Sequence, residues 1–240
     1  MTIAEADSVE TTTGNIARIV ARAREQNNIP NFVAVEGPIG VGKTTLATRL
    51  AQSFGYPTVL EPALENPFLD RFYREGSRHA LPTQLFFLLN RARHASDFPQ
   101  NDLLDPQLVT DFLVEKDALF AQLTLDENEL ALYQQIYQNL DIQLPKPDLV
   151  IYLQAPVPVL QNRIQRRGIN FEQTIEDDYL SALIDRYTEF FHYYERAPLL
   201  VVNATEIDFA HNDDHFEALL QRIFQMEGTR QFFNPNPTLI

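Results

Sequence analysis

Residues 37–44 combine three glycines, a lysine and a threonine in the pattern G-x-x-x-x-G-K-[ST] of a phosphate-binding loop. An apolar run at 32–35 precedes them, and apolar residues at helical spacing follow as far as Gly55. A strand, a glycine loop and a helix N-terminus in this order direct backbone N–H groups at a polyphosphate. The residues expected to bind a nucleotide here are Gly37, Pro38, Ile39, Gly40, Val41, Gly42, Lys43, Thr44 and Thr45.

Two side chains of this segment have expected chemical roles. Lys43 is expected to reach the outer phosphates and the hydroxyl of Thr44 to ligate Mg²⁺, which is therefore the expected cofactor. The chain holds only three lysines and eight glycines. One of the three lysines at the required position and three of the eight glycines within this short segment argue against a chance match in a plain tight turn.

The elements that must position this loop alternate between short apolar strands and helical segments. The strands are expected at 32–35, 57–61, 108–110, 149–153 and 199–202. This alternation predicts an α/β fold with three layers, in which helices cover both faces of a central parallel five-stranded sheet. Ligands of such folds bind at the carboxyl ends of the strands.

The composition is typical of one compact domain. The chain has 240 residues, of which 45% are hydrophobic, and it contains no cysteine, which excludes disulfides and thiol chemistry. No apolar run reaches the length of a membrane span. The net charge of -14 argues against a nucleic-acid polymer as partner, since such polymers bind basic surfaces. We therefore expect a cytoplasmic protein with no membrane partner.

The two ends are expected to lie outside the domain at 29–226. Residues 1–28 form an extension with an added helix that Asn15 caps, and residues 227–240 form a tail that is loose after Gly228. The extension contains several arginines, as an organelle presequence does, but Glu5, Asp7 and Glu10 are wrong for one.

Glu61 follows the second expected strand, so its carboxylate is expected near the phosphate loop. A carboxylate there can accept a proton from an acceptor hydroxyl as a phosphoryl group is transferred. A GTP-hydrolysing switch would instead need the elements D-x-x-G and N-K-x-D. None of the eight glycines has Asp three positions before it, and none of the three lysines follows Asn, so the sequence argues against a switch.

The run E-P-A-L-E-N-P-F-L from Glu61, followed by Tyr73, Gln84 and Arg91, resembles the deoxyribonucleoside kinase family. The resemblance covers residues 31 to about 226. It implies a P-loop kinase fold in which Glu61 is the catalytic base and a ligand of Mg²⁺. It also implies that Tyr73 contacts the sugar 3′-OH, Gln84 pairs with the base edge and Arg91 lies over the nucleobase.

The segment after the third strand resembles the same family with one departure. Asp111 stands where the family often has an acidic residue followed by Arg, but here Phe112 follows. Lys116 is a candidate for the missing cation, and Asp117 matches the aspartate that reads the base. Lys116 and Asp117 together resemble the bacterial deoxyguanosine and deoxyadenosine kinase branch, which implies a purine substrate.

The resemblance also implies a short lid over residues 163–175. Arg163 and Arg167 are expected to contact the transferring phosphates, and Arg166 to substitute for the further arginine that this chain replaces by Ile169. Glu172 matches a glutamate that bonds the 3′-OH. Residues 203–209, with Asp208 and Phe209, resemble the loop that cradles the adenine of ATP.

The resemblance as a whole implies an ATP- and Mg²⁺-dependent 5′-kinase of deoxyribonucleosides in nucleotide salvage, acting as a homodimer. It leaves guanine and adenine equally open, because an amide such as Gln84 can suit either base. Two other readings also stay open. A thymidylate or other nucleoside-monophosphate kinase shares the loop and lid, although its acceptor phosphate favours Arg at position 112. A nucleotide-binding protein that has lost catalysis would also keep the loop.

Overall fold

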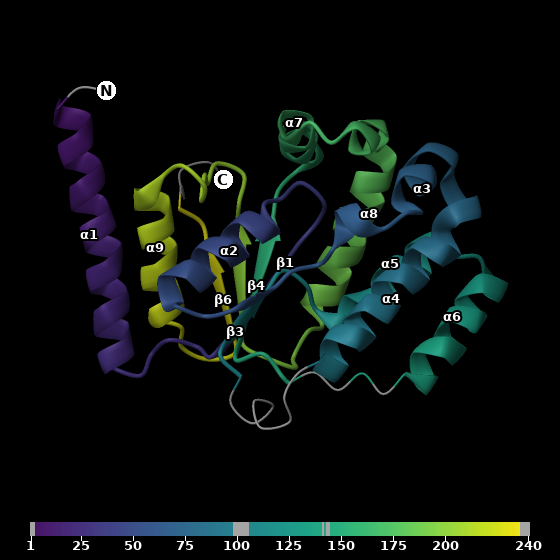
Figure 1. Ribbon diagram of the computed structural model, residues 1–240, viewed down its shortest axis with the longest axis horizontal. Coiled ribbons are helices and arrows are strands. Elements are labelled where there is room, and N and C mark those ends of the chain that lie inside the picture. The colour runs from purple at the N-terminus through teal and green to yellow at the C-terminus, as the bar shows by residue number, and fades with distance from the viewer. Residues whose placement is uncertain (1–2, 98–105, 141, 143–144, 236–240) are drawn as a thin grey trace.

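The computed structural model describes residues 3–97, 106–140, 142 and 145–235. A parallel sheet of six strands lies at its centre, in the order β2-β3-β1-β4-β5-β6 (Figure 1). The strands are β1 Phe32–Glu36, β2 Thr58–Val59, β3 Leu108–Thr110, β4 Leu149–Gln154, β5 Leu199–Asn203 and β6 Arg230–Phe233. The expected α/β fold with a parallel sheet is confirmed.

Helices cover both faces of the sheet, with α1, α2 and α9 on one side and α5 and α8 on the other (Figure 1). The helices are α1 Ile3–Glu25, α2 Lys43–Phe54, α3 Leu69–Glu75, α4 Ala80–Asp97, α5 Asp117–Thr124, α6 Glu127–Asn139, α7 Val157–Arg167, α8 Asp177–His192 and α9 Asp213–Phe224. Single 3₁₀ turns occupy η1 Ala63–Glu65, η2 Gly76–His79, η3 Val114–Lys116 and η4 Asn170–Thr174.

Successive residues of the central strands belong to two different hydrophobic cores. In β1, Val33 and Val35 pack with α2 and α9, whereas Phe32 and Ala34 pack with α8. Strands β4 and β5 alternate in the same way. A sheet buried on both faces requires near-continuous apolar strands, which is why these strands could be recognised in the sequence.

The expected count of five strands is wrong, because β6 pairs with β5 from Leu199↔Arg230 to Val202↔Phe233. The segment after Gly228 is therefore not a loose tail as far as residue 233. Its sequence, R-Q-F-F, lacks the alternation of a half-buried strand, and its residues are only partly covered. The Arg230 guanidinium anchors the strand by donating to three backbone carbonyls, those of Phe191, His192 and Tyr194. Residues 236–240 of the expected tail lie outside the described residues.

The added N-terminal helix is confirmed, but its expected start is wrong. Helix α1 begins at Ile3, so Asn15 lies inside the helix instead of capping it. The Asn15 amide donates to the Glu217 carboxylate of α9 at 2.5 Å. Val20 and Ala23 are buried in the core, so the helix packs as part of the same body.

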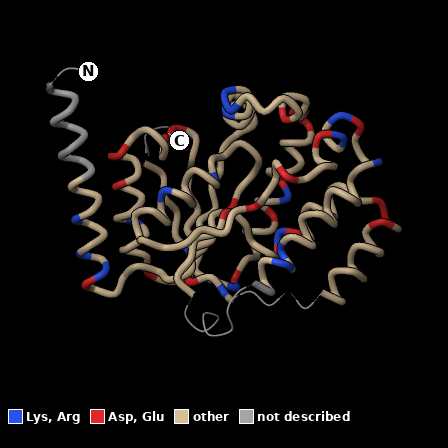
Figure 2. The backbone as a smooth tube through the Cα atoms, viewed as in Figure 1, with Lys and Arg blue, Asp and Glu red and all other residues tan. Residues whose placement is uncertain are grey.

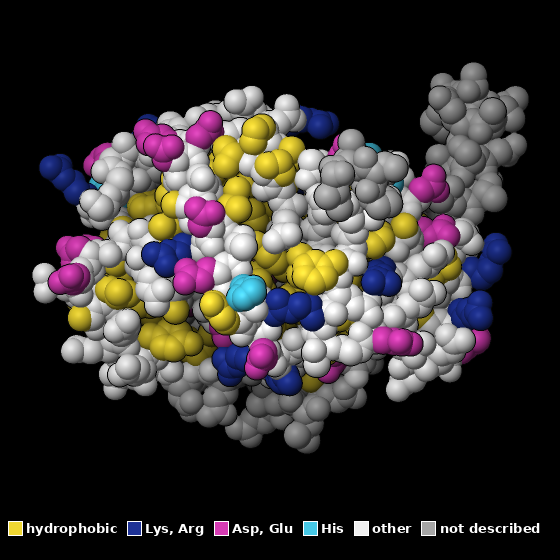
Figure 3. Space-filling model, turned by 180° about the vertical axis from the view of Figure 1, so that it is seen from behind, with side chains coloured by type: hydrophobic (Ala, Val, Ile, Leu, Met, Phe, Trp, Pro, Cys, Tyr) yellow, Lys and Arg dark blue, Asp and Glu magenta, His cyan; other side chains and the backbone are white. Residues whose placement is uncertain are grey.

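Acidic and basic side chains are interspersed over the described surface seen from behind (Figure 3). Among the helices of the described ranges, none is both long and apolar enough to cross a membrane.

Candidate active site

The phosphate loop connects β1 to α2 and packs tightly against neighbouring backbone. A Cβ on Gly37, whose φ is 149°, would lie 2.5 Å from the Leu153 carbonyl oxygen at the end of β4. A Cβ on Gly40, whose φ is 80°, would lie 2.9 Å from the Leu160 carbonyl oxygen of α7. Only glycine fits at these two positions, so the packing of the loop requires Gly37, the first glycine of the pattern, and also Gly40 within it.

Lys43, the first residue of α2, folds its ammonium group back over this loop. Its Nζ donates to the carbonyl oxygens of Gly37 at 2.7 Å and Pro38 at 3.2 Å. Burial, and then the charge of Lys116, lower the pKa of Lys43 to about 8. The loop therefore holds a half-buried cation that donates to two carbonyl oxygens, which suits it for binding an anionic ligand.

Asp111 joins the phosphate loop to the end of the second strand. One of its oxygens accepts a hydrogen bond from the Thr44 hydroxyl at 2.5 Å, and the other accepts one from the Glu61 backbone N–H at 2.7 Å. Burial raises the pKa of Asp111 in spite of these two bonds. Hydroxyl and carboxylate oxygens thus meet at the carboxyl edge of the sheet, as the order of strands and loops predicted.

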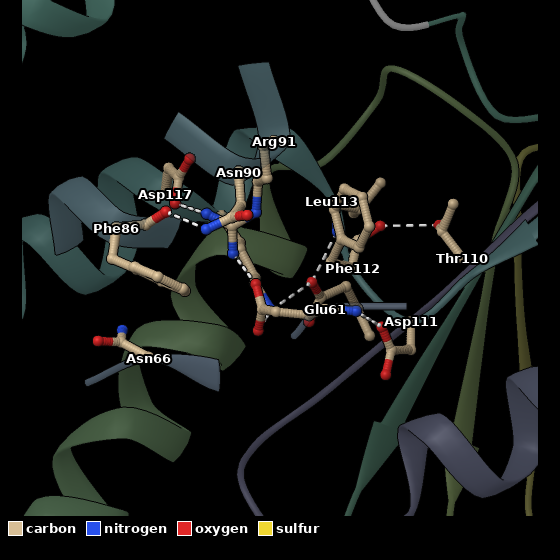
Figure 4. Close-up of polar contacts among 12 residues, drawn as sticks. Glu61, Asn66, Phe86, Asn90, Arg91, Thr110, Asp111, Phe112, Leu113 and Asp117 are labelled. Carbon is tan, nitrogen blue, oxygen red and sulfur yellow. Dashed lines mark hydrogen bonds and ion pairs between the residues drawn. The ribbon is translucent and has the colours of Figure 1, made fainter. Parts of the chain in front are cut away.

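The Glu61 carboxylate lies between two cations. Arg91 of α4 forms an ion pair with it and a second one with Asp117 (Figure 4). Lys116 Nζ lies 3.2 Å from the other Glu61 oxygen. Burial raises the pKa of Glu61, but Arg91, Lys116 and Lys43 outweigh it and hold that pKa at about 2. Glu61 is therefore ionised throughout the neutral pH range.

The geometry gives a physical reason for Phe112. The Arg91 guanidinium carbon lies 5.6 Å from the centre of the Phe112 ring and 5.8 Å from that of Phe87. Aromatic faces attract guanidinium groups, whereas an arginine at position 112 would bring a second cation toward Arg91. Lys116 supplies a cation beside Glu61 instead.

The side chains of Lys43, Glu61, Arg91 and Lys116 line one cavity of about 120 Å³, whereas Phe112 does not. This volume is far more than the ~10–15 Å³ that one water molecule needs. The Gln84 amide in this cavity donates to the Thr124 hydroxyl at 3.3 Å. Among the described residues, the buried Asp117 Oδ2 and Arg91 Nε have no hydrogen-bond partner. Asp117 and Arg91 both line the cavity, and the edge of a nucleobase presents donors and acceptors that suit a carboxylate and a guanidinium group. The sequence-predicted residues that line the cavity are Ile39, Gly40, Lys43, Thr44, Glu61, Tyr73, Gln84, Arg91, Asp111, Lys116, Asp117, Arg167 and Glu172.

Tyr73 and Glu172 lie together at another part of the cavity. The Tyr73 ring is nearly parallel to that of Phe171, with ring centres 6.1 Å apart and planes at 16°. Glu172 is buried and pairs with Arg167. Burial strongly raises the pKa of Tyr73, with Tyr179 and Glu172 adding to the effect, so its hydroxyl keeps its proton and can donate.

A family model for deoxynucleoside kinases matches residues 33–226 of this chain. The chain belongs to the deoxynucleoside kinase family. A nucleoside-monophosphate kinase and a non-catalytic nucleotide-binding protein, the two alternatives left open by the sequence, are not favoured by these comparisons. Enzymes of this class transfer a phosphoryl group to a nucleoside hydroxyl, which is the kinase chemistry that the cavity suggests.

Curated relatives of this deoxynucleoside kinase include two bacterial enzymes. The deoxyguanosine kinase of Bacillus subtilis strain 168 is 37% identical over 204 residues, which are 83% of this chain and 99% of the relative. The deoxyadenosine kinase of Lactobacillus acidophilus is 27% identical over 205 residues, 80% of this chain and 94% of the relative. The solved structure of a deoxyadenosine kinase from M. mycoides with bound dATP matches this chain with a TM-score of 0.68 and 24% identity. The match covers 80% of this chain and 98% of that one, which shows the shared fold.

The two expected lid arginines of this deoxynucleoside kinase have different surroundings. Both lie on α7, whose basic end stands at the top of Figure 2. Arg167 lines the cavity. The Arg163 guanidinium instead lies under the phosphate loop, where it donates to the backbone oxygens of Val41 at 3.0 Å, Ala204 at 2.6 Å and Ile207 at 3.2 Å. Arg163 thus connects the phosphate loop to the segment 203–209.

The other expected donor-site residues lie outside the cavity lining. Asp208 is exposed, and its carboxylate accepts hydrogen bonds from the backbone N–H groups of Ala210 and His211, each at 3.0 Å. Phe209 is buried in the core, and Thr45 is exposed on the first turn of α2. The contacts of Arg163 hold the segment that precedes Asp208 beside the phosphate loop.

Several residues of the site were missed in the sequence. Thr83, Phe87 and Tyr179 line the cavity, and nothing in their spacing distinguishes them from ordinary core or helix-surface residues. Glu36 is fully buried at the end of β1. It could have been found, since a carboxylate that ends a strand of apolar residues must find hydrogen-bond donors.

Proposed function

We propose that this kinase transfers the γ-phosphoryl group of ATP to the 5′-hydroxyl of a purine deoxyribonucleoside, as a step of nucleotide salvage. The observation that carries the proposal is the position of Glu61. Its backbone N–H bonds Asp111, which bonds Thr44 of the phosphate loop, and its carboxylate contacts Arg91, which pairs with Asp117 in the acceptor cavity. A hydroxyl beside Glu61 would thus lie between a donor site and a base-reading site.

Each side chain has a role that follows from this placement. Glu61 accepts the proton of the 5′-hydroxyl as the phosphoryl group is transferred. Lys43 leaves its carbonyl partners for the donor phosphates, and Arg167 neutralises charge that develops on the transferring group. Arg163 holds the segment with Asp208 and Phe209 where the adenine of ATP binds. Lys116 steadies the reacting end of the acceptor.

Mg²⁺ fits the oxygens at the carboxyl edge of the sheet. The Thr44 hydroxyl and the Asp111 carboxylate are in contact, and Glu61 follows on the same edge. Mg²⁺ usually takes one or two carboxylates and completes its shell with water and phosphate oxygens. The Thr44 hydroxyl and the carboxylates of Asp111 and Glu61 would hold Mg²⁺ there, and the ion would supply positive charge that offsets the charge of the ATP phosphates.

The purine preference rests on the relatives and on the polar groups of the cavity. The relatives include a deoxyguanosine kinase at 37% identity and a deoxyadenosine kinase at 27% identity. Gln84, Arg91 and Asp117 offer donors and acceptors to a base edge. A panel of the four deoxynucleosides and their monophosphates, with ATP in excess, tests the proposal. Phosphorylation of monophosphates instead of nucleosides, or a preference for deoxycytidine or thymidine, would contradict it.

Ribonucleosides are expected to be poor acceptors, with kcat/KM ~10- to 100-fold below that of the deoxy forms. The reason is that Tyr73 and Glu172 bond the 3′-OH of the sugar, and the Tyr73 ring then occupies the space that a 2′-OH needs. Kinetics with guanosine and deoxyguanosine measure this preference. Tyr73→Phe should weaken the discrimination between deoxyguanosine and its 3′-deoxy analogue. The matched control is Tyr179→Phe, which removes a hydroxyl from a second tyrosine of the same cavity. Equal kcat/KM for guanosine and deoxyguanosine would remove Tyr73 from the sugar site.

Gln84→Ala is expected to lower kcat/KM for purine deoxynucleosides roughly 5- to 150-fold, because it leaves polar groups of the base unpaired in a buried cavity. The KM for ATP should stay unchanged. Gln122→Ala on the exposed side of α5 is the matched control. A Gln84→Ala enzyme with unaltered kcat/KM for both purines would show that the base does not contact this amide.

The oligomeric state, the cellular location and the domain boundaries stay predictions. The family resemblance supports a homodimer in the cytoplasm, and sedimentation equilibrium of the full chain tests the first of these. The predicted division into an extension at 1–28, a kinase domain at 29–226 and a tail at 227–240 is tested by removing residues 1–28 and measuring folding and turnover.

A further inference from the structure

Glu36 is the most buried charged residue at this edge of the sheet, with no exposed surface. Both of its oxygens are engaged. Oε2 accepts hydrogen bonds from the Gly37 backbone N–H at 3.0 Å and the Tyr187 hydroxyl at 2.9 Å. Oε1 accepts one from the Leu113 backbone N–H at 2.8 Å and lies 3.2 Å from Lys116 Nζ. A buried carboxylate is tolerated only with such a full set of donors.

Lys116 is held between two carboxylates as a result. Its Nζ lies 3.2 Å from Glu36 Oε1 and 3.2 Å from Glu61 Oε2, and 5.7 Å from the centre of the Phe120 ring. A lysine side chain has many rotamers and lacks the rigid fork of an arginine. Without Glu36, the carboxylate of Glu61 would be the one left of these two beside the Lys116 ammonium group, and Glu61 is the proposed catalytic base.

We propose that Glu36 is a positioning residue for phosphoryl transfer, which fixes the Lys116 ammonium group beside Glu61 and so at the reacting end of the acceptor. The inference rests on the proposed function, in which Lys116 steadies that end of the acceptor. Glu36 does not reach the reacting atoms; it acts through Lys116. Its other contacts, with Gly37 and Tyr187, are structural.

The competing explanation is that Glu36 matters only for the phosphate loop, through the Gly37 N–H. The two explanations predict different kinetics. Loss of the Lys116 anchor should lower kcat and leave the KM values of both substrates nearly unchanged, because the misplaced group acts on the reacting atoms. A disturbed phosphate loop should raise the KM for ATP.

The test is a double-mutant cycle on the full chain with Glu36→Gln, Lys116→Met and the two combined. Glu36→Gln is expected to lower kcat ~10- to 100-fold, with KM for ATP and for deoxyguanosine within about threefold of wild type. Lys116→Met should lower kcat at least as much, and the combined variant no further than Lys116→Met alone. Tyr187→Phe, which removes a donor to the other oxygen of Glu36, should change stability more than kcat.

Glu36→Asp extends the test if Glu36→Gln does not fold, because it keeps the charge and draws the carboxylate back from Lys116. It should lower kcat by an intermediate factor. Three results would each overturn the proposal. The first is a combined variant whose loss of kcat equals the product of the two single losses. The second is a raised KM for ATP with kcat unchanged, and the third is a Glu36→Asp enzyme with the wild-type kcat. A failure of the proposed function is distinguishable from these results, because the wild-type protein would then not phosphorylate purine deoxynucleosides.

Discussion

Replacing Glu61 by glutamine is expected to lower kcat ~10²- to 10⁴-fold while the affinity for ATP stays nearly intact. Glutamine has almost the same shape but cannot accept a proton, and its backbone N–H can still bond Asp111. The two cations beside Glu61, Arg91 and Lys116, keep its carboxylate ionised before the substrate binds. Steady-state kinetics and ATP titration of the purified variant measure the two quantities.

The control for this variant must separate lost chemistry from lost folding. Glu61→Gln leaves Arg91 and Lys116 with less negative charge around them, and unbalanced buried charge destabilises proteins. Thermal unfolding of the variant therefore accompanies the kinetics. Glu65→Gln makes the same change in an exposed glutamate of η1 and should leave kcat unchanged. Near-normal turnover of a folded Glu61→Gln enzyme would remove Glu61 from the role of base.

Part of the site could be predicted because its geometry is local. A strand, a glycine loop and a helix fix the direction of the phosphate-binding N–H groups, so Lys43 and Thr44 follow from the motif alone. Gln84 and Arg91 are seven residues apart, which is about two helical turns, and therefore share one face of α4. Both line the cavity.

The rest could not be predicted because it depends on contacts between distant segments. Tyr187 bonds Glu36 across 151 positions, and Arg163 bonds Val41 across 122. No spacing rule connects such pairs. The sequence therefore gives no sign of the backbone contacts of Arg163 or of the contacts of Glu36. Strand β6 could not be recognised for a different reason. It lies at the edge of the sheet, where its residues are only partly buried, so its sequence lacks the apolar pattern of a central strand.

Lys43→Met is expected to lower kcat ~10²- to 10³-fold, which is the typical loss when one group that stabilises transition-state charge is removed from a preorganised site. The thioether keeps much of the length of the side chain without its charge. Deoxynucleoside binding, measured by calorimetry, should remain, because the acceptor contacts are made by other residues. Lys146→Met, at an exposed lysine, is the matched control.

The pH dependence of ATP binding is an independent test of the positive charge on Lys43. Burial and the charge of Lys116 lower the pKa of Lys43 to about 8 in the ligand-free protein. Only the ammonium form attracts phosphates, so above that pH binding must first take up a proton, and affinity falls as the pH rises. For a bound-state pKa well above 9, the affinity of the wild-type protein should drop about tenfold between pH 7 and pH 9. ATP itself is fully ionised at the upper end of this interval, so the loss comes from the protein. In Lys43→Met the drop should be absent, and an equal drop in both proteins would assign the titration to another group.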